Sequence, residues 1–248
     1  MFGRRRSAGD RDVAAPADLT AEFGEEVAGD EDGTGGLAPR AAGPWDAAEP
    51  HPDTQRVDLG SLRVPVLPGL DIQLVFADQH GAWVTVRQAT SELQLQAFAA
   101  PKRGSLWEDV RAEIAGEINA AGGTSAERPG PFGIEVVGRV PVEQGQPQSG
   151  MRPVRFTGVD GPRWFLRGLF TGAAADDPRA AAPLEELMRQ VVVVRGEHPV
   201  PPRDLLELRL PPEAAQALAE EQARGGQDNR FATPPNPFER GPEFTETR

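Results

Sequence analysis

One stretch, Asp160 to Phe170, constrains the fold of this chain more than any other. It reads Asp-Gly-Pro-Arg-Trp-Phe-Leu-Arg-Gly-Leu-Phe, which is typical of a turn followed by a strand with large aromatic side chains on both faces. A strand that is apolar on both faces belongs near the middle of a sheet. The stretch indicates little about chemistry, because no nucleophile with its base, metal cluster or phosphate loop accompanies it.

The balance of charges along the chain predicts one folded region between two acidic tails. Residues 1–55 hold 12 acids and 5 bases, residues 56–210 hold 19 and 17, and residues 211–248 hold 7 and 4. The 25 prolines and 28 glycines are densest outside the middle, so we expect a folded part of roughly 150 residues. The predicted organisation is a disordered acidic tail over 1–55, a single domain over 56–210, a polar helix over 211–223 and a disordered Pro-rich tail over 224–248.

Composition also excludes several classes of protein. The chain has no cysteine, so disulfides, thiolate catalysis and zinc–thiolate sites are excluded. No apolar run approaches the roughly 20 residues of a spanning helix, and no signal peptide follows the first arginines, so the expected location is the cytoplasm. The three histidines, His51, His80 and His198, lack partners at ligand spacing. We therefore predict no metal and no cofactor.

Hydrophobic periodicity predicts an α+β fold, with a mostly antiparallel sheet packed with two main helices. Alternation with period two predicts six strands, at residues 71–76, 82–89, 92–99, 132–142, 151–159 and 163–171. Short edge pieces are expected at 57–59 and 62–66, and a last strand or short helix at 205–210. A helical period predicts helices from Leu106 to Ala121 and from Ala180 to Arg195, although the valines at 191–194 favour a strand by propensity.

Arginines are the one feature of the predicted sheet that suggests a binding surface. A tight turn over Val159–Pro162 is expected to place Val154 and Phe156 beside Trp164 on one buried face. The opposite face would then carry a basic ridge able to hold a carboxylate, phosphate or acidic peptide. Its candidate binding residues are Arg139, Arg152, Arg155, Arg163 and Arg167. The alternative is an ordinary solvated face, neutralised by Glu135, Asp160 or helix acids.

Both tails contain residues that could contact a partner. Leu19, Phe23 and Val27 recur at a spacing of four, which allows a transient helix that docks on another protein. Trp45, Phe231 and Phe238 are candidate aromatic anchors. The acidic N-terminal tail could also lie over the arginine face and screen it.

Two long motifs carry a resemblance to a known family. They are Ala100–Arg111, with Lys-Arg-Gly-Ser-Leu-Trp-Glu-Asp at its centre, and Asp160–Gly168; the opening Met-Phe-Gly-Arg-Arg-Arg fits as well. Over roughly residues 55–210 the chain resembles an actinobacterial family recorded only as domain of unknown function 3710. That resemblance implies no activity. The element order is also similar to the Mog1/PsbP-like sandwich, a scaffold used mainly for protein contacts, which implies a binding role.

These observations favour a non-enzymatic, cytoplasmic protein-interaction or regulatory module with a protein partner. One alternative is a nucleic-acid-associated accessory protein that uses Arg155, Arg163 and Arg167 on phosphates. Another is an enzyme acting on a small anionic substrate, with Glu135 or Asp160 as base. The enzyme alternative predicts a concave pocket that holds an arginine and a carboxylate with a raised pKa.

Overall fold

The computed structural model describes residues 42–77, 81–142, 150–211 and 214–216. Residues up to Arg209 belong to one compact unit, and Leu210 begins a second. In the second unit Ala214–Gln216 are helical, and the Ala215 amide donates to the Pro211 carbonyl at 2.9 Å. Residues 1–41 of the predicted N-terminal tail and the whole predicted C-terminal tail over 224–248 lie outside the described residues. Most of the helix predicted over 211–223 lies outside them as well.

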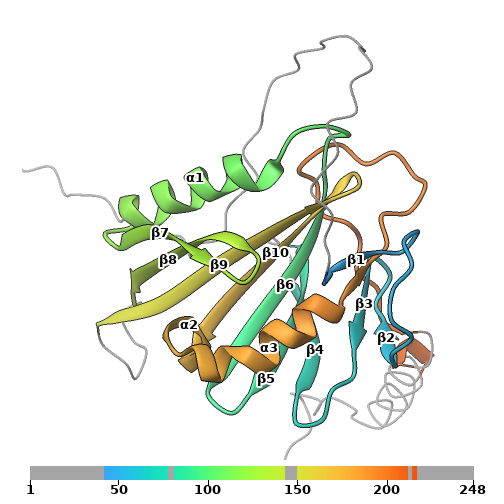
Figure 1. Cartoon of the computed structure of the whole chain (residues 1–248), viewed down its shortest axis with the longest axis horizontal. Helices are drawn as coiled ribbons and strands as arrows, with labels where there is room; N and C mark the ends of the chain where they lie inside the picture. The colour runs from blue at the N-terminus through green and yellow to red at the C-terminus, as the bar shows by residue number, and fades with distance from the viewer. Residues whose placement is uncertain (1–41, 78–80, 143–149, 212–213, 217–248) are drawn as a thin grey trace, which may run out of the picture. The chain divides into compact units, whose positions relative to one another are not determined.

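The first unit is an α+β fold, as the sequence predicts, and its strands form two sheets (Figure 1). The larger sheet is antiparallel, in the order β4-β5-β6-β10-β9-β8-β7. These strands are β4 Asp71–Ala77, β5 Gly81–Gln88, β6 Ser91–Ala99, β7 Thr124–Gly130, β8 Gly133–Pro141, β9 Met151–Gly161 and β10 Trp164–Gly172. The smaller sheet has the order β1-β11-β3-β2, with β1 Trp45–Asp46, β2 Arg56–Asp58, β3 Leu62–Pro65 and β11 Val192–Val193.

The stretch that follows the central turn forms β10, which lies between β6 and β9. Trp164, Leu166 and Phe170 are buried on one face of this strand, and Phe165 is buried on the other. An apolar strand with both faces covered therefore occupies the middle of the sheet, as predicted.

Helices cover the two faces of the larger sheet. α1, Leu106–Ala120, packs Trp107, Ile114 and Ile118 against Phe165 and the β8–β9 pair. α3, Pro178–Gln190, packs Leu184, Leu187 and Met188 against the opposite face, where β3 of the smaller sheet joins the same core. The one-turn helix α2, Ala173–Asp176, links β10 to α3.

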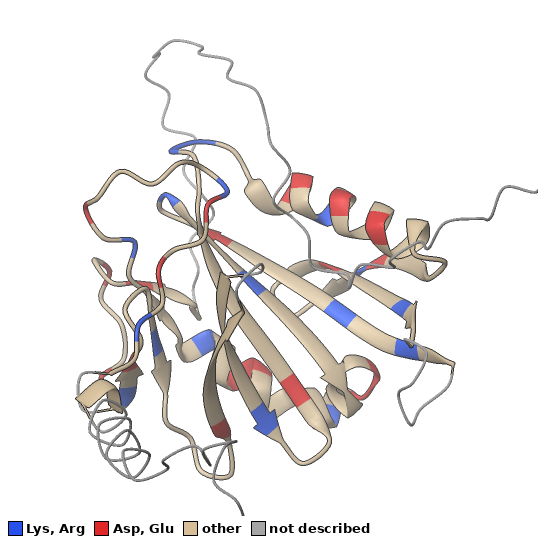
Figure 2. Ribbon diagram, turned by 180° about the vertical axis from the view of Figure 1, so that it is seen from behind, with Lys and Arg blue, Asp and Glu red and all other residues tan. Residues whose placement is uncertain are grey.

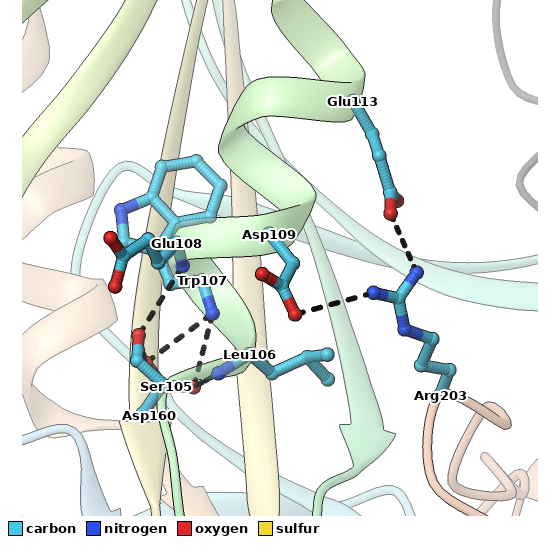
Figure 3. Close-up of polar contacts among 8 residues, drawn as sticks. All are labelled: Ser105, Leu106, Trp107, Glu108, Asp109, Glu113, Asp160 and Arg203. Atoms are coloured by element: carbon cyan, nitrogen blue, oxygen red, sulfur yellow. Dashed lines mark hydrogen bonds and ion pairs between the residues drawn. The ribbon is translucent and has the colours of Figure 1, made fainter. Parts of the chain in front are cut away.

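The start of α1 joins the two sequence motifs that resemble the family. Asp160, in the second motif, accepts hydrogen bonds from the amides of Leu106 at 2.9 Å and Trp107 at 3.3 Å and from the Ser105 hydroxyl at 2.7 Å (Figure 3). Ser105 in turn accepts from the Glu108 amide. Two side chains therefore satisfy amides that the first turn of a helix leaves without intrahelical partners.

The structure differs from the prediction in three places. β1 lies within the predicted N-terminal tail: it pairs with β11, and Asp46 accepts from Trp164 Nε1 at 2.6 Å. The predicted second helix ends at Gln190, not Arg195, because the β-branched valines after it form β11. β7 was missed, because Pro129 and Gly130 obscure its alternation.

The prediction that Arg155 and Arg167 share one face as a basic ridge is wrong. The register of the β9–β10 hairpin explains why. β9 runs to Gly161 and β10 starts at Trp164, so Pro162 and Arg163 form the turn. With a two-residue turn, odd-numbered positions of one strand face even-numbered positions of the other. Arg155 is therefore opposite Phe170, while Phe156 is opposite Leu169 on the face of Phe165.

Candidate functional site

The five predicted arginines lie in three different places: the two faces of the sheet and a turn. Four of them come from neighbouring strands, but alternation sends Arg139 and Arg155 to the α3 face and Arg152 and Arg167 to the α1 face. Arg163 lies in the turn, with a positive φ of 61°. No shared row of guanidinium groups results, so the structure does not bring these residues together. Their role in binding as a set stays a prediction.

Arg167 is partly buried and is engaged by neighbouring side chains of the sheet. Its guanidinium donates to Gln96 Oε1 and lies 5.4 Å from the ring centroid of Phe98. Burial lowers the pKa of Arg167 to about 10, with the carboxylate of Glu117 acting in the opposite direction. The face around this side chain is largely apolar and aromatic.

Arg155 is the centre of a buried charged cluster beneath α2 and α3. Its Nη1 lies 3.1 Å from Glu135 Oε1 on β8 and 2.8 Å from Glu185 Oε1 on α3. The guanidinium carbon lies 3.9 Å from the ring centroid of Phe170, and Nη2 donates to the Ala174 carbonyl at 3.4 Å. Only 2% of Arg155 is exposed, so this guanidinium is sandwiched between an aromatic ring and two carboxylates.

Burial dominates the protonation of Glu135. The residue is fully buried, and this burial raises the pKa of its carboxyl group above the ordinary 4.5. Arg155 and Arg128 act in the opposite direction, the latter with its Nε 3.8 Å away. Glu185 adds a second negative charge that raises the pKa further.

A pocket of about 270 Å³ opens beside this cluster. The β7–β8 hairpin forms one wall and the segment from α2 into α3 forms the other. The lining residues are Arg128, Pro129, Gly130, Pro131, Glu135, Arg155, Ala174, Ala175, Asp176, Asp177, Pro178, Ala181 and Glu185. We call this hollow the hairpin pocket.

Carboxylates outnumber guanidinium groups in the lining of the hairpin pocket. Four carboxylates, those of Glu135, Asp176, Asp177 and Glu185, stand against the two guanidinium groups of Arg128 and Arg155. Asp176 also pairs with Arg139 at 3.1 Å, so part of the excess is balanced at the rim. Arg155 uses its Nη groups on protein acceptors, whereas each carboxylate offers about four acceptor sites. The pocket therefore presents acceptors to a ligand.

The hairpin wall depends on a glycine. A Cβ on Gly130 would lie 2.0 Å from the carboxylate carbon of Glu135, which is closer than real Cβ contacts. Glu135 thus occupies the space that a side chain at this position would need. Position 130, within Arg-Pro-Gly-Pro at 128–131, therefore has no room for a side chain beside the buried carboxylate.

Sequence reasoning missed Glu185, Asp176 and Asp177. Glu185 had a readable signal: it lies on the inner face of α3 beside Leu184 and four residues after Ala181, both buried, where an acid needs a partner. Asp177 caps α3 by accepting from the Arg179 amide at 2.9 Å. Asp176 had no signal, because its position depends on how α2 meets the hairpin.

The two proposed catalytic bases have structural roles. Asp160 caps α1, as described above. Glu135 combines a raised pKa with a neighbouring arginine in a pocket, which are the features that the enzyme alternative predicts, but only 1% of its side chain is exposed. A substrate could reach Glu185 more readily, since 12% of that side chain is exposed.

Within residues 42–77, 81–142, 150–211 and 214–216, no three histidine, aspartate or glutamate side chains gather as a metal site would require. No helix in these ranges has the length and apolarity to cross a membrane.

The fold and its site define an α+β protein with an antiparallel seven-stranded sheet and a carboxylate-lined pocket over one sheet face. A family of proteins of unknown function, DUF3710, matches residues 43–217, and the chain belongs to it. This confirms the resemblance carried by the motifs at 100–111 and 160–168, and adds β1 to the region they cover. No curated protein matches the chain.

Proposed function

We propose that this protein is a non-enzymatic interaction module whose hairpin pocket binds a cationic group, such as the guanidinium of an arginine side chain on a partner protein. The observation that carries the proposal is the excess of carboxylates around the pocket, with Arg155 already engaged by protein acceptors. The expected role as an interaction module is kept. The expected charge of the partner is reversed, from acidic to basic.

The accessible acids would take different parts of the binding. Glu185 lies deep in the pocket and is held by Arg155, so its remaining lone pairs can accept from a guanidinium without the loss of its own partner. Asp176 is exposed at the rim, where it attracts a cation at longer range. A bidentate donor such as guanidinium suits paired carboxylate oxygens better than an ammonium does.

Size and apolar walls favour a single side chain as the occupant. A pocket of about 270 Å³ lies just below the 300–1,000 Å³ range of drug-sized ligand sites. Pro129, Pro131 and Pro178 line its walls. Long basic side chains bury their methylene stems against apolar surfaces of this kind while the charged head reaches a carboxylate.

The two alternatives have less support. Phosphate binding by an arginine row loses its basis, because Arg155 and Arg167 lie on opposite sheet faces. Catalysis at Glu135 would need a substrate to reach a sealed carboxylate. The likeness to a Mog1/PsbP-like sandwich, which element order supports, stays a proposal. The cytoplasmic location also stays a proposal.

A binding titration tests the proposed function. Fluorescence anisotropy of a labelled glycine–serine peptide with one central arginine should show saturable binding to the full chain, with weaker binding for lysine and none for glutamate at that position. Free argininamide as a competitor separates a small-molecule site, where it displaces the peptide fully, from a peptide site, where it competes poorly.

A matched pair of variants locates the binding. Asp176→Asn removes a rim charge from an exposed arginine pair and should weaken the arginine peptide several-fold. Asp58→Asn makes the same change in the exposed pair with Arg63, whose atoms lie 3.3 Å apart, and should leave affinity unchanged. Equal effects of the two variants, or preference for the glutamate peptide, would overturn the proposal.

A further inference from the structure

The two edges of the seven-stranded sheet are protected to different degrees. β7 carries Glu127, Arg128 and Pro129, and charges and proline are the usual means of blocking edge-to-edge pairing. β4 at the other edge reads Asp-Ile-Gln-Leu-Val-Phe-Ala and contains no proline, lysine or arginine. Its one charge, Asp71, is at its first residue.

The outer side of β4 has unused backbone groups. β4 pairs with β5 from Asp71 opposite Arg87 to Ala77 opposite Gly81. Among the described residues, no other strand or loop hydrogen-bonds to the backbone of β4. Seven residues of edge are therefore available to template another strand.

The apolar side chains of β4 extend the core to this edge of the sheet, but the last of them stays exposed to solvent. Ile72, Leu74 and Phe76 share the α3 face of the sheet; Ile72 and Leu74 pack partly against the main core. Phe76 is 57% exposed, the highest value among the large apolar side chains that the structure describes as exposed. An apolar row that ends at a free edge is a surface for a partner strand.

We infer that β4 pairs antiparallel with β4 of a second copy of this chain, about a two-fold axis at Leu74. In that register Leu74 faces the partner's Leu74, and Phe76 faces the partner's Ile72. The apolar row thus continues across the junction in both directions. Asp71 faces the partner's Ala77, so no like charges meet, whereas an in-register parallel pair would set Asp71 against the partner's Asp71.

The distribution of charge along the chain also favours a second copy of this chain as the partner of β4. The net charge of −12 would oppose self-association if it lay on the folded surface, but residues 56–210 hold 19 acids and 17 bases, a net of −2. The pairing joins two sheets at the edge away from β7, which leaves the hairpin pocket of each copy open. The inference is independent of what that pocket binds.

Light scattering of the full chain during size-exclusion chromatography tests the pairing. We expect a mass near twice 26.6 kDa that falls to 26.6 kDa on dilution. Phe76→Lys should give the monomer mass at every concentration, while Val66→Lys, at an exposed position outside β4, should keep the dimer. Far-ultraviolet circular dichroism checks that each variant is folded.

A cysteine cross-link tests the register without disturbing the edge. The chain has no cysteine, so Leu74→Cys introduces a single thiol on the proposed axis. Directly opposed residues have Cα atoms about 4.5–5.5 Å apart, within the range of a disulfide. Mild oxidation should cross-link Leu74→Cys and not Asn119→Cys, on an exposed position of α1. A monomeric wild type at all concentrations, loss of the dimer in Val66→Lys, or equal cross-linking of both cysteines would overturn the inference.

Discussion

The two faces of the seven-stranded sheet are covered by helices in different ways. On the α1 face the Trp107 and Phe165 rings stack with centroids 5.9 Å apart, and Asp160 caps the helix at its end. On the α3 face a buried charged cluster, Arg155 with Glu135 and Glu185, lies under the helix. Acidic residues also mark α1 (Figure 2), but they lie mostly on its solvent side.

This difference between the two faces is the basis of the proposed function. The α1 face is closed by apolar packing and by a cap whose polar groups are satisfied. The α3 face buries charge, which costs free energy unless every group is paired, and it leaves a pocket where the carboxylates are in excess. A face built to be stable alone has no need of such an arrangement.

The largest expected effect concerns Arg155 itself. Arg155→Leu leaves Glu135 and Glu185 buried without their counterion, and we expect a loss of about 3–5 kcal/mol in the free energy of unfolding. Urea denaturation followed by circular dichroism measures it. The triple variant Arg155→Leu, Glu135→Leu, Glu185→Leu should recover most of this loss. A neutral result for the single variant would mean that the buried ion pairs are not formed.

A glycine on the opposite face gives the next largest effect. A Cβ at Gly158 would lie 2.4 Å from the Trp107 ring, so Gly158→Ala should cost about 1–3 kcal/mol through overpacking. Gly116→Ala is the matched control, because a Cβ there meets nothing within 4 Å in the middle of α1. It should stabilise the protein by up to about 1 kcal/mol. The same sign for both variants would contradict the packing described for α1.

Removal of the cap on α1 should reduce stability less than Arg155→Leu or Gly158→Ala does. Asp160→Ala removes the acceptor for the Leu106 and Trp107 amides and should cost about 1 kcal/mol of stability. Thermal unfolding measures this loss. Binding of the arginine peptide should be unaffected, since Asp160 is not among the residues that line the hairpin pocket. Reduced peptide affinity in a folded Asp160→Ala would place the binding surface on the α1 face of the sheet, opposite the hairpin pocket.

A smaller, pH-dependent effect separates the buried carboxylate from the exposed ones. Because the pKa of Glu135 is raised above 4.5 in the folded state, the unfolded chain releases this proton first as pH rises. The contribution of Glu135 to stability is therefore highest below pH 4.5 and falls as pH rises from 4.5 through the raised pKa. Glu135→Gln should remove this fall, seen as a flatter pH profile of the unfolding free energy than that of wild type. An identical profile in the two proteins would show that Glu135 does not titrate in this way.

Much of the fold could be predicted from local patterns. The strands β4, β5 and β6, the start of α1 after Ser105 and the central position of Trp164 and Phe165 all follow from periodicity and turn chemistry. β11 and β1 could not be assigned in the same way, because each has two residues and depends on a partner distant in sequence.

The site was harder to predict than the fold, because it depends on which face each strand residue occupies. Arg155 was recognised as a candidate, but its face follows from a two-residue turn at Pro162–Arg163, whereas the pattern indicated a turn over Val159–Pro162. Gly130 and Glu185 reach the same pocket from segments more than 50 residues apart. No local pattern encodes that convergence.

Mapping the arginine peptide onto the protein tests the central claim most directly. Amide chemical shifts of the isotope-labelled chain should move on titration at Gly130, Ala174 and Ala175, which line the hairpin pocket, and stay fixed at Arg152 and Arg163. The account predicts saturable shifts at the first group, with a midpoint that moves to several-fold higher peptide concentration in Asp176→Asn. Shifts confined to Arg152, Arg163 or the α1 face, with none at the pocket, would contradict it.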